Sequence, residues 1–269
     1  MMSNMLLDLE RKSQQLFDEW KYLLLQEKCR LCKRMIHPLI EKMDFDSYRP
    51  PARYFIGHKE VVSDVICQFC LPDLSSFQAV LRKHQTVRCA EGMDELAEFL
   101  VGSAAVFMEP IQSLIYSLKY SEDVLLAKDL ACLMYEAWQL LREEITEFDD
   151  IDSLCLVPVP LHKKRLHERG FNQAEAIARH FSQLTSIKLE RRVISRIKNT
   201  KSQQTLSKSQ RASNVAGAFK AVTANVFADK TVILIDDVCT SGATLVNCAQ
   251  ASFAGGAQSV HALTVAFVP

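Results

Sequence analysis

The sequence predicts an α/β fold in which helices flank a twisted parallel sheet, and three observations support this prediction. Residues 232–235 are all β-branched or leucine, as expected for a strand that is buried on both faces of a parallel sheet. Residues 154–160 form a second apolar segment, which two prolines bring to an end. A helical pattern over 243–253 and an apolar segment over 260–268 complete an alternation of strands and helices, which is typical of parallel sheets.

We expect two regions, an N-terminal one over residues 1–102 and the α/β domain over residues 103–269. Residues 1–28 interleave apolar with charged side chains, a pattern that indicates an amphipathic helix and lacks the unbroken apolar core of a signal peptide. No segment of the sequence is long and apolar enough to span a bilayer. We therefore expect a cytoplasmic protein that does not insert into membranes.

Four cysteines of the N-terminal region form two C-x2-C pairs, Cys29 with Cys32 and Cys67 with Cys70. Each pair can place two thiolates on one turn, so the two pairs together complete a tetrahedral zinc site. Because all four positions are then filled, we expect the zinc to be structural rather than catalytic. Disulfides are not expected in a reducing cytoplasm.

The other cysteines and two histidines leave some alternatives open. His37 and His58 lie between the two pairs and could each replace a cysteine ligand, although four cysteines make the simpler set. Cys89 has no C-x2-C partner and is expected to stand alone. The remaining four cysteines lie in apolar or helical segments and are expected to be small core residues, namely Cys132, Cys155, Cys239 and Cys248.

Further helices are expected on either side of the segment at 154–160. Residues 111–120 and 124–141 both show helical periodicity. Residues 161–170 are predicted to form a basic loop, and residues 172–184 return to a helical pattern. These segments supply the crossover helices that a parallel sheet needs.

Two adjacent acids, Asp236 and Asp237, follow the point where the strand at 232–235 is expected to end. A small loop comes next, at 240–244, and leads into the helical segment at 243–253. Ligands of open α/β sheets bind outside the carboxyl ends of the strands, and a loop that runs into a helix N-terminus favours phosphate. Carboxylates accept hydrogen bonds from vicinal hydroxyls. The pattern therefore indicates a sugar phosphate as the ligand.

The charge of the chain is zero overall but unevenly distributed. Residues 161–220 contain fourteen basic and three acidic residues, a net charge of +11. This asymmetry indicates an anionic ligand, either a pyrophosphate, a nucleic acid or both, although a solvated basic surface is the alternative. Residues 161–170 carry Arg165 and Arg169, and arginine matches phosphate oxygens in bidentate geometry. Residues 196–215 are polar and weakly periodic, as in a mobile active-site lid.

Residues 232–244 resemble the 5-phosphoribosyl-1-diphosphate (PRPP) signature of type I phosphoribosyltransferases. A wider set of motifs comprises the four cysteines, Leu-Ile-Tyr-Ser-Leu-Lys-Tyr at 114–120, Pro-Val-Pro at 158–160, Glu-Arg-Gly-Phe-Asn-Gln at 168–173, Lys-Asn-Thr-Lys-Ser-Gln-Gln at 198–204 and the PRPP signature. In their order along roughly residues 25–269, these motifs resemble the ComF family. The resemblance implies a type I phosphoribosyltransferase fold with an added zinc region.

The resemblance also implies a ligand set. Asp236 and Asp237 would hold the ribose hydroxyls of PRPP. The 5-phosphate would lie on the following loop, formed by Thr240, Ser241, Gly242, Ala243 and Thr244. Arg165 and Arg169 would lie near the pyrophosphate, Arg196 and Lys198 would belong to the flexible loop, and Mg²⁺ would accompany PRPP. The implied role is that of a cytoplasmic factor of natural transformation, acting on incoming single-stranded DNA with a helicase-like translocase as partner.

Two other functions are compatible with the same residues. The first is a metabolic phosphoribosyltransferase of nucleobase salvage, which would need a well-formed pocket for a free base. The second is a non-catalytic adaptor with a vestigial PRPP site, although the intact acid pair argues against complete decay because clustered acids without a ligand cost stability. No residue pattern identifies the acceptor of a phosphoribosyl group or a general base, so enzymatic activity stays open.

Overall fold

The computed structural model describes most of the chain, and the structural statements below concern the residues that it describes. These are residues 28–36, 48–49, 51–56, 59–75, 78–88, 96–121, 123–145, 151–198 and 217–269. Their contacts divide into two units, which we describe separately. The first comprises residues up to 55 together with 60–72, and the second comprises residues 56–59 and 73–269. The predicted N-terminal helix, apart from its last residue, and the residues His37, His58 and Cys89 lie outside the described residues.

The first unit consists of short strands around the two cysteine pairs. β1 is parallel to β2, and β3 pairs with β4 in a separate two-stranded sheet. The elements are β1 (Met35–Ile36), β2 (Tyr48–Arg49), β3 (Pro51–Ile56) and β4 (Lys59–Cys67), and the helix α2 (Leu71–Ser75) follows them. Ala52 and Val65 are fully buried. Because β4 ends at Cys67, the second cysteine pair lies at the end of a strand.

The second unit is built on a six-stranded sheet in the order β5-β6-β12-β11-β7-β8. All neighbouring strands are parallel except β5 and β6, which are antiparallel. The strands are β5 (Val80–Arg88), β6 (Leu96–Val106), β7 (Leu154–Pro158), β8 (Lys188–Leu189), β11 (Thr231–Cys239) and β12 (Ser259–Phe267). The prediction of an α/β fold with a parallel sheet is therefore confirmed.

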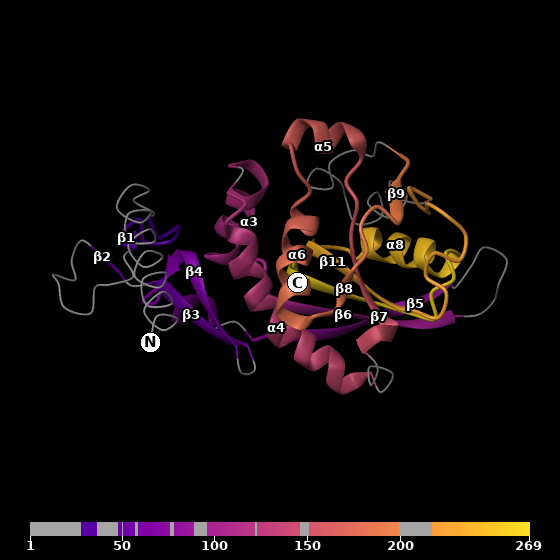
Figure 1. The fold of residues 1–269 in the computed structure, drawn as a ribbon, viewed down its shortest axis with the longest axis horizontal. Helices are drawn as coiled ribbons and strands as arrows, with labels where there is room; N and C mark the ends of the chain where they lie inside the picture. Colours follow the sequence, from indigo (N-terminus) through magenta and orange to yellow (C-terminus); the bar gives the residue numbers. More distant parts are fainter. Residues whose placement is uncertain are drawn as a thin grey trace, which may run out of the picture. The chain divides into compact units, whose positions relative to one another are not determined.

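Helices cover both faces of this sheet (Figure 1). α4 and α6 pack against each other and against the sheet, while α8 packs against the other face and against the small antiparallel pair of β9 and β10. These elements are α3 (Ile111–Tyr120), α4 (Leu126–Glu144), α5 (Lys163–Arg169), α6 (Gln173–Thr185), β9 (Ile194–Arg196), β10 (Phe219–Ala221) and α8 (Ala243–Ala254), with a 3-10 turn η2 (Ile151–Ser153) before β7. Among the described helices, none combines the length and the apolar character needed to cross a membrane.

The core of the second unit lies where the sequence predicts continuous apolar strands. The four residues at 232–235 are fully buried in the middle of the sheet. Gly102 of β6 permits close packing of α4, because a Cβ atom there would lie 2.9 Å from a Leu263 methyl carbon and 3.0 Å from the carbonyl oxygen of Ala137. The polar pair of Ser103 and Thr264 is buried between β6 and β12, and its hydroxyl groups are hydrogen-bonded at 2.7 Å.

The predicted helices at 111–120, 124–141, 172–184 and 243–253 are present as α3, α4, α6 and α8. α6 begins where the side chain of Asn172 accepts a hydrogen bond from the Ala174 amide at 3.1 Å, as an N-cap does. The predicted strands at 154–160 and 260–268 are present as β7 and β12.

The predicted basic loop at 161–170 is instead largely the short helix α5. The His162 side chain accepts a hydrogen bond from the Lys164 amide at 3.2 Å and so caps the first turn. Gly170, with φ of 77°, ends the helix in a conformation that L-residues with side chains rarely adopt. Local capping, rather than apolar periodicity, therefore accounts for this helix.

The division between the two units also differs from the sequence-based expectation. The sequence predicts a boundary near residue 102, but this residue lies inside β6, and the second unit already begins near residue 73. β5 pairs with β6 along most of its length, for example Leu81 with Gly102, and β6 in turn pairs with β12. β5 and β6 therefore complete the edge of the sheet rather than extend the cysteine-bearing region.

Candidate functional site

β11 extends beyond the end of its neighbour β7 at the carboxyl edge of the sheet. The sequence predicts that this strand ends before Asp236, but β11 continues to Cys239. Its pairing with β7 stops at Ile235, opposite Pro158, whereas its pairing with β12 continues to Cys239. The part of β11 that carries Asp236 and Asp237 therefore has β12 as its neighbour on one side and no paired strand on the side of β7. From β7 the chain continues to β8 at one edge of the sheet, whereas from β11 it continues to β12 on the other side. The carboxyl ends of β7 and β11 therefore form a topological switch point, where open α/β sheets bind ligands.

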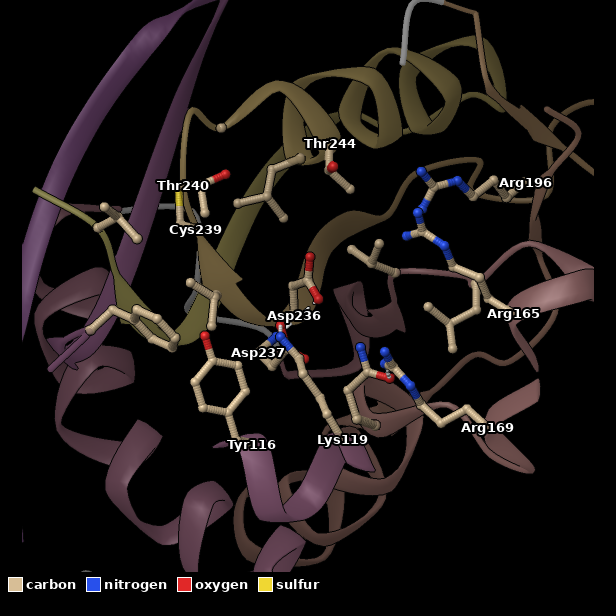
Figure 2. Close-up of a pocket in the computed structure, with 18 of the residues that line it drawn as sticks. Tyr116, Lys119, Arg165, Arg169, Arg196, Asp236, Asp237, Cys239, Thr240 and Thr244 are labelled. Carbon is tan, nitrogen blue, oxygen red and sulfur yellow. Dashed lines mark hydrogen bonds and ion pairs between the residues drawn. The ribbon is translucent and has the colours of Figure 1, made fainter. Parts of the chain in front are cut away.

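A cavity of about 550 Å³ opens at this point. Figure 2 shows Thr240 and Thr244 at one edge of the cavity, three arginine side chains at another, and the acid pair between them. The cavity thus combines a hydroxyl-bearing loop, two carboxylates and a cluster of cations within one enclosure.

The acid pair is held by a lysine from α3. Lys119 Nζ lies 2.9 Å from Asp237 Oδ1, and both side chains are largely buried, at 15% and 6% exposure. The backbone amide of Asp237 donates to Asp236 Oδ1 at 2.9 Å, which orients the first carboxylate. Burial, followed by the charge of Asp237, raises the pKa of Asp236 to about 7. A ligand that donates hydrogen bonds to the two carboxylates would offset part of the free-energy cost of keeping both of them charged and buried.

The loop at 240–244 carries the features of a phosphate site. Gly242, with φ of 73°, is the N-cap residue of α8, and the loop leads directly into that helix. Thr240, Gly242 and Thr244 line the cavity, whereas Ser241 and Ala243 are not among the lining residues. Among the described residues, two buried oxygen atoms beside this cavity have no hydrogen-bond partner, Ser241 Oγ and Asp237 Oδ2. Such atoms are uncommon in folded proteins and are consistent with a site that a polar ligand completes.

Three arginines, Arg165, Arg169 and Arg196, form the cationic wall, and neighbouring side chains contact two of them. Arg169 donates to Gln173 Oε1 at 2.6 Å, and its guanidinium lies 5.4 Å from the ring centre of Tyr120. Arg196 is only 9% exposed and lies 5.2 Å from the ring centre of Phe219. Burial, followed by the charge of the nearby Arg165, lowers the pKa of Arg196. Like charges held together in a concave site favour a ligand with several negative charges.

The structure brings most of the predicted residues together but not all of them. The sequence predicts that Arg196 lies in a flexible loop, yet it is the last residue of β9, paired with Phe219 of β10. Lys198 is exposed and does not line the cavity. Residues 199–216 of the expected lid lie outside the described residues.

Helix α3 contributes cavity residues that the sequence reasoning did not assign. Tyr116, Lys119 and Tyr120 all line the cavity. They follow i, i+3, i+4 spacing and so share one face of the helix, opposite the buried apolar residues. Phe107 packs edge-on against Tyr116, with ring centres 5.9 Å apart, and extends an aromatic wall beside the acid pair. In the sequence, the helical spacing of Tyr116, Lys119 and Tyr120 is the pattern that could have identified this face of α3 as part of the site.

The chain after β7 is anchored next to the acid pair. The amide of Val159 donates to the carbonyl of Ile235 at 2.9 Å, so the segment remains attached to β11 beyond the end of β7. The carbonyl of Val159 accepts a hydrogen bond from the Asn172 side chain at 3.0 Å. These two bonds fix the start of the segment that carries the arginines of α5.

The four cysteines of the two C-x2-C pairs converge in the first unit. Their sulfur atoms all lie within 4.8 Å of one another, and Cys32 Sγ is 3.8 Å from Cys67 Sγ. Sulfur atoms bound tetrahedrally at about 2.3 Å from zinc lie about 3.8 Å apart, so the cluster fits this metal. A hydrogen bond with Cys67 and backbone amides lower the pKa of Cys29 to about 4, whereas burial and the Cys29 charge raise the pKa of Cys70 to about 12. A cation is therefore needed before all four thiols can ionise.

The other described cysteines are core residues, as the sequence predicts. Their exposure is at most 3%, and burial raises the pKa of Cys239 to about 11, which argues against a nucleophilic role. None of the described cysteines forms a disulfide.

Comparison with known proteins extends these observations. Residues 166–269 match the family model of the phosphoribosyl transferase domain. Competence protein F of Haemophilus influenzae is 33% identical over 140 residues, which represent 52% of this chain and 60% of that relative. DNA utilization protein YhgH is 28% identical in Escherichia coli and 27% identical in Salmonella typhimurium, in each case over 160 residues, 59% of this chain and 68% of the relative.

The matched part of the chain thus spans less than two thirds of the length of Competence protein F. The family model nevertheless includes β11 with its acid pair, the loop at 240–244, α8 and β12. The matches show that this chain carries a C-terminal domain of the phosphoribosyltransferase type and, with the order of the motifs and the parallel sheet, they support its assignment to the ComF family.

Proposed function

We propose that the cavity at the carboxyl end of β11 binds PRPP and that the protein acts in DNA uptake. The observation that carries this proposal is the position of the Asp236–Asp237 pair between a phosphate-type loop and an arginine wall within one cavity. PRPP has a phosphate, two vicinal hydroxyls and a pyrophosphate in the same order. The charges and hydrogen-bonding groups of the cavity therefore complement each part of this ligand.

In the proposed complex, each part of PRPP has its own partners. The 5-phosphate lies on the loop at 240–244, where the backbone amides before α8 and the threonine hydroxyls can donate to it. The ribose hydroxyls donate to Asp236 and Asp237, and one of them takes up the unpartnered Oδ2 of Asp237. The pyrophosphate binds the arginine wall, with Lys198 as an additional cation near Arg196.

Phosphoribosyl transfer is the reaction that this arrangement can support. A nucleophile would form a bond to the anomeric carbon of the ribose as the bond from that carbon to the pyrophosphate oxygen breaks. The arginines would stabilise the charge that develops on the departing pyrophosphate, and the acid pair would hold the ribose in position. Mg²⁺ suits this oxygen-rich site beside the acid pair and, when bound with PRPP, would neutralise part of the pyrophosphate charge.

The cysteine cluster supports a separate structural role. Cys29, Cys32, Cys67 and Cys70 would hold one zinc ion, with no position left for a substrate. The metal would tie the turn at residues 29–33 to the end of β4, and so stabilise a unit whose described residues form two small sheets.

The relatives support the biological part of the proposal. One is named for competence and others for the utilization of DNA, and the basic segment at 161–220 offers charge for a nucleic acid. We propose that the protein handles incoming single-stranded DNA in the cytoplasm, with a helicase-like translocase as its partner.

Replacement of both acids tests the proposed site. Asp236→Asn with Asp237→Asn should reduce the affinity for Mg-PRPP, measured by titration calorimetry, by at least tenfold, because both hydroxyl acceptors lose their charge. Asp152→Asn with Asp229→Asn is the matched control, since it removes two exposed acids from the same unit. Unchanged affinity in the first variant, with its fold intact by circular dichroism, would contradict the site. Absence of binding in the wild type at millimolar PRPP would favour the adaptor function instead.

A further inference from the structure

A second cavity, of about 710 Å³, adjoins the first one. The two cavities share two lining residues, Leu161 and Arg196, and both are in contact with α5. The second cavity also reaches the start of α6 and the turn before β9. It is therefore distinct from the proposed PRPP site but continuous with its arginine wall.

Helix α5 separates the two cavities and presents a different face to each. Arg165 and Arg169, spaced i and i+4, line the first cavity. Lys163 and Leu166, spaced i and i+3, line the second cavity, where Leu166 is 41% exposed. The basic segment thus divides its cations between two sites, and the proposed binding of PRPP accounts for only one of them.

The second cavity combines cations with an apolar surface. Its lining includes Lys163, Arg179, Arg192 and the shared Arg196, but only one acid, Glu175. Glu175 Oε1 is itself paired with Arg179 at 3.5 Å and with Arg191 at 3.3 Å, so it adds little negative charge to the cavity.

Phe171 lies among these cations, at the start of α6, with Leu166 and Ile194 also in the lining. Inorganic phosphate would neutralise the cations but would leave the apolar surface of the cavity without a binding partner. A nucleotide has a phosphate and a planar base, and single-stranded nucleic acids bind where cationic grooves carry aromatic or apolar platforms for the bases.

We propose that the second cavity binds a nucleotide segment of a single-stranded nucleic acid, with phosphates on Lys163, Arg179 and Arg192 and a base against Phe171. This proposal rests on the proposed role in DNA handling and gives that role a location. A strand bound in this cavity passes directly beside the PRPP site, because Leu161 and Arg196 belong to both cavities.

A charge-matched pair of variants of the full chain tests the proposal. Lys163→Gln with Arg192→Gln removes two cations that line the second cavity. Lys164→Gln with Lys220→Gln is the control, because both residues are exposed cations of the same basic segment and neither lines either of the two cavities. Binding of a fluorescein-labelled 20-nucleotide oligo(dT) is followed by anisotropy at several salt concentrations, and Mg-PRPP binding is measured separately by calorimetry.

The cavity variant should bind oligo(dT) about tenfold more weakly than the control variant, and its log-log salt dependence should be shallower by roughly 1.4, since each lost phosphate contact to a single strand removes about 0.7. Its PRPP affinity should equal that of the control. Equal oligo(dT) affinity in the two variants would overturn the proposal, as would a wild type that binds PRPP but not oligo(dT). A wild type that binds oligo(dT) but not PRPP, together with weaker oligo(dT) binding in the cavity variant than in the control, would instead contradict the proposed PRPP site and support the second cavity.

Discussion

The contribution of the ion pair between Lys119 and Asp237 to the stability of the second unit can be measured. We expect Lys119→Met to destabilise the second unit, because it leaves the Asp237 carboxylate, which is 6% exposed, without its cation. Asp237→Asn should cost less. Lys119 retains more access to water at 15% exposure, and this substitution also removes the charge that faces Asp236.

The magnitude follows from the geometry. Two unit charges 2.9 Å apart attract each other by about 6 kcal/mol at an effective dielectric constant of about 20. The cost of removing two nearly buried ions from water offsets most of this attraction. We therefore expect Lys119→Met to lower the free energy of unfolding by about 2–3 kcal/mol and Asp237→Asn to lower it by about 1 kcal/mol. The double variant should resemble Asp237→Asn alone, which corresponds to a coupling energy of about 2–3 kcal/mol.

Urea unfolding of the four proteins in the cycle measures this coupling. The chain contains two tryptophans, Trp20 and Trp138. In a Trp20→Phe background, the fluorescence reports on Trp138, which is 4% exposed in α4 and packs edge-on against Phe181 of the second unit. Additive losses, with a coupling energy below about 0.5 kcal/mol, would refute the inference that Lys119 and Asp237 stabilise each other.

Two further predictions concern pH and zinc. Because the pKa of Asp236 is raised to about 7, the folded protein holds this proton more tightly than the unfolded chain does, so the stability of the empty protein should fall as the pH rises from about 4 to about 7. The affinity for PRPP should rise between about pH 6 and pH 8 as the Asp236 carboxylate ionises. Asp236→Asn should remove the pH dependence of stability and of PRPP affinity, except for the part that comes from the titration of PRPP itself. A wild-type pH profile in that variant would contradict the assignment of both effects to Asp236. Cys67→Ser should abolish zinc binding, measured by mass spectrometry of metal content, whereas Cys132→Ala should retain one zinc per chain; stoichiometric zinc in Cys67→Ser would rule out the four-cysteine site.

The central strands could be predicted because they are buried on both faces. A strand such as 232–235 has no solvent-facing side, so its sequence is continuously apolar and stands out from its surroundings. β6 does not stand out in this way, because small residues at Gly102, Ser103 and Ala104 replace the large aliphatic ones where α4 packs closely. The boundary of the second unit was misplaced for this reason.

The site could be predicted in the part that a local motif encodes. The acid pair and the loop at 240–244 are separated by two residues in sequence, and the structure places the acids and three residues of the loop at one cavity. Lys119 was not assigned, because its contact with Asp237 joins segments that are far apart in the chain and depends on how α3 packs beside the sheet. Arg196 was expected in a mobile loop, since its polar neighbours conceal the short strand β9 and its pairing with β10.

Arg196 has one further consequence, because its guanidinium belongs to the lining of both cavities. Two anionic ligands that bind on either side of one cation do not bind independently, because its charge attracts both of them. The first to arrive screens the charge for the second, and the resulting antagonism must be equal in both directions. With both cavities filled as proposed, the cellular concentration of PRPP would set the residence time of the strand, so that a metabolite of nucleotide synthesis would regulate how long the protein retains DNA.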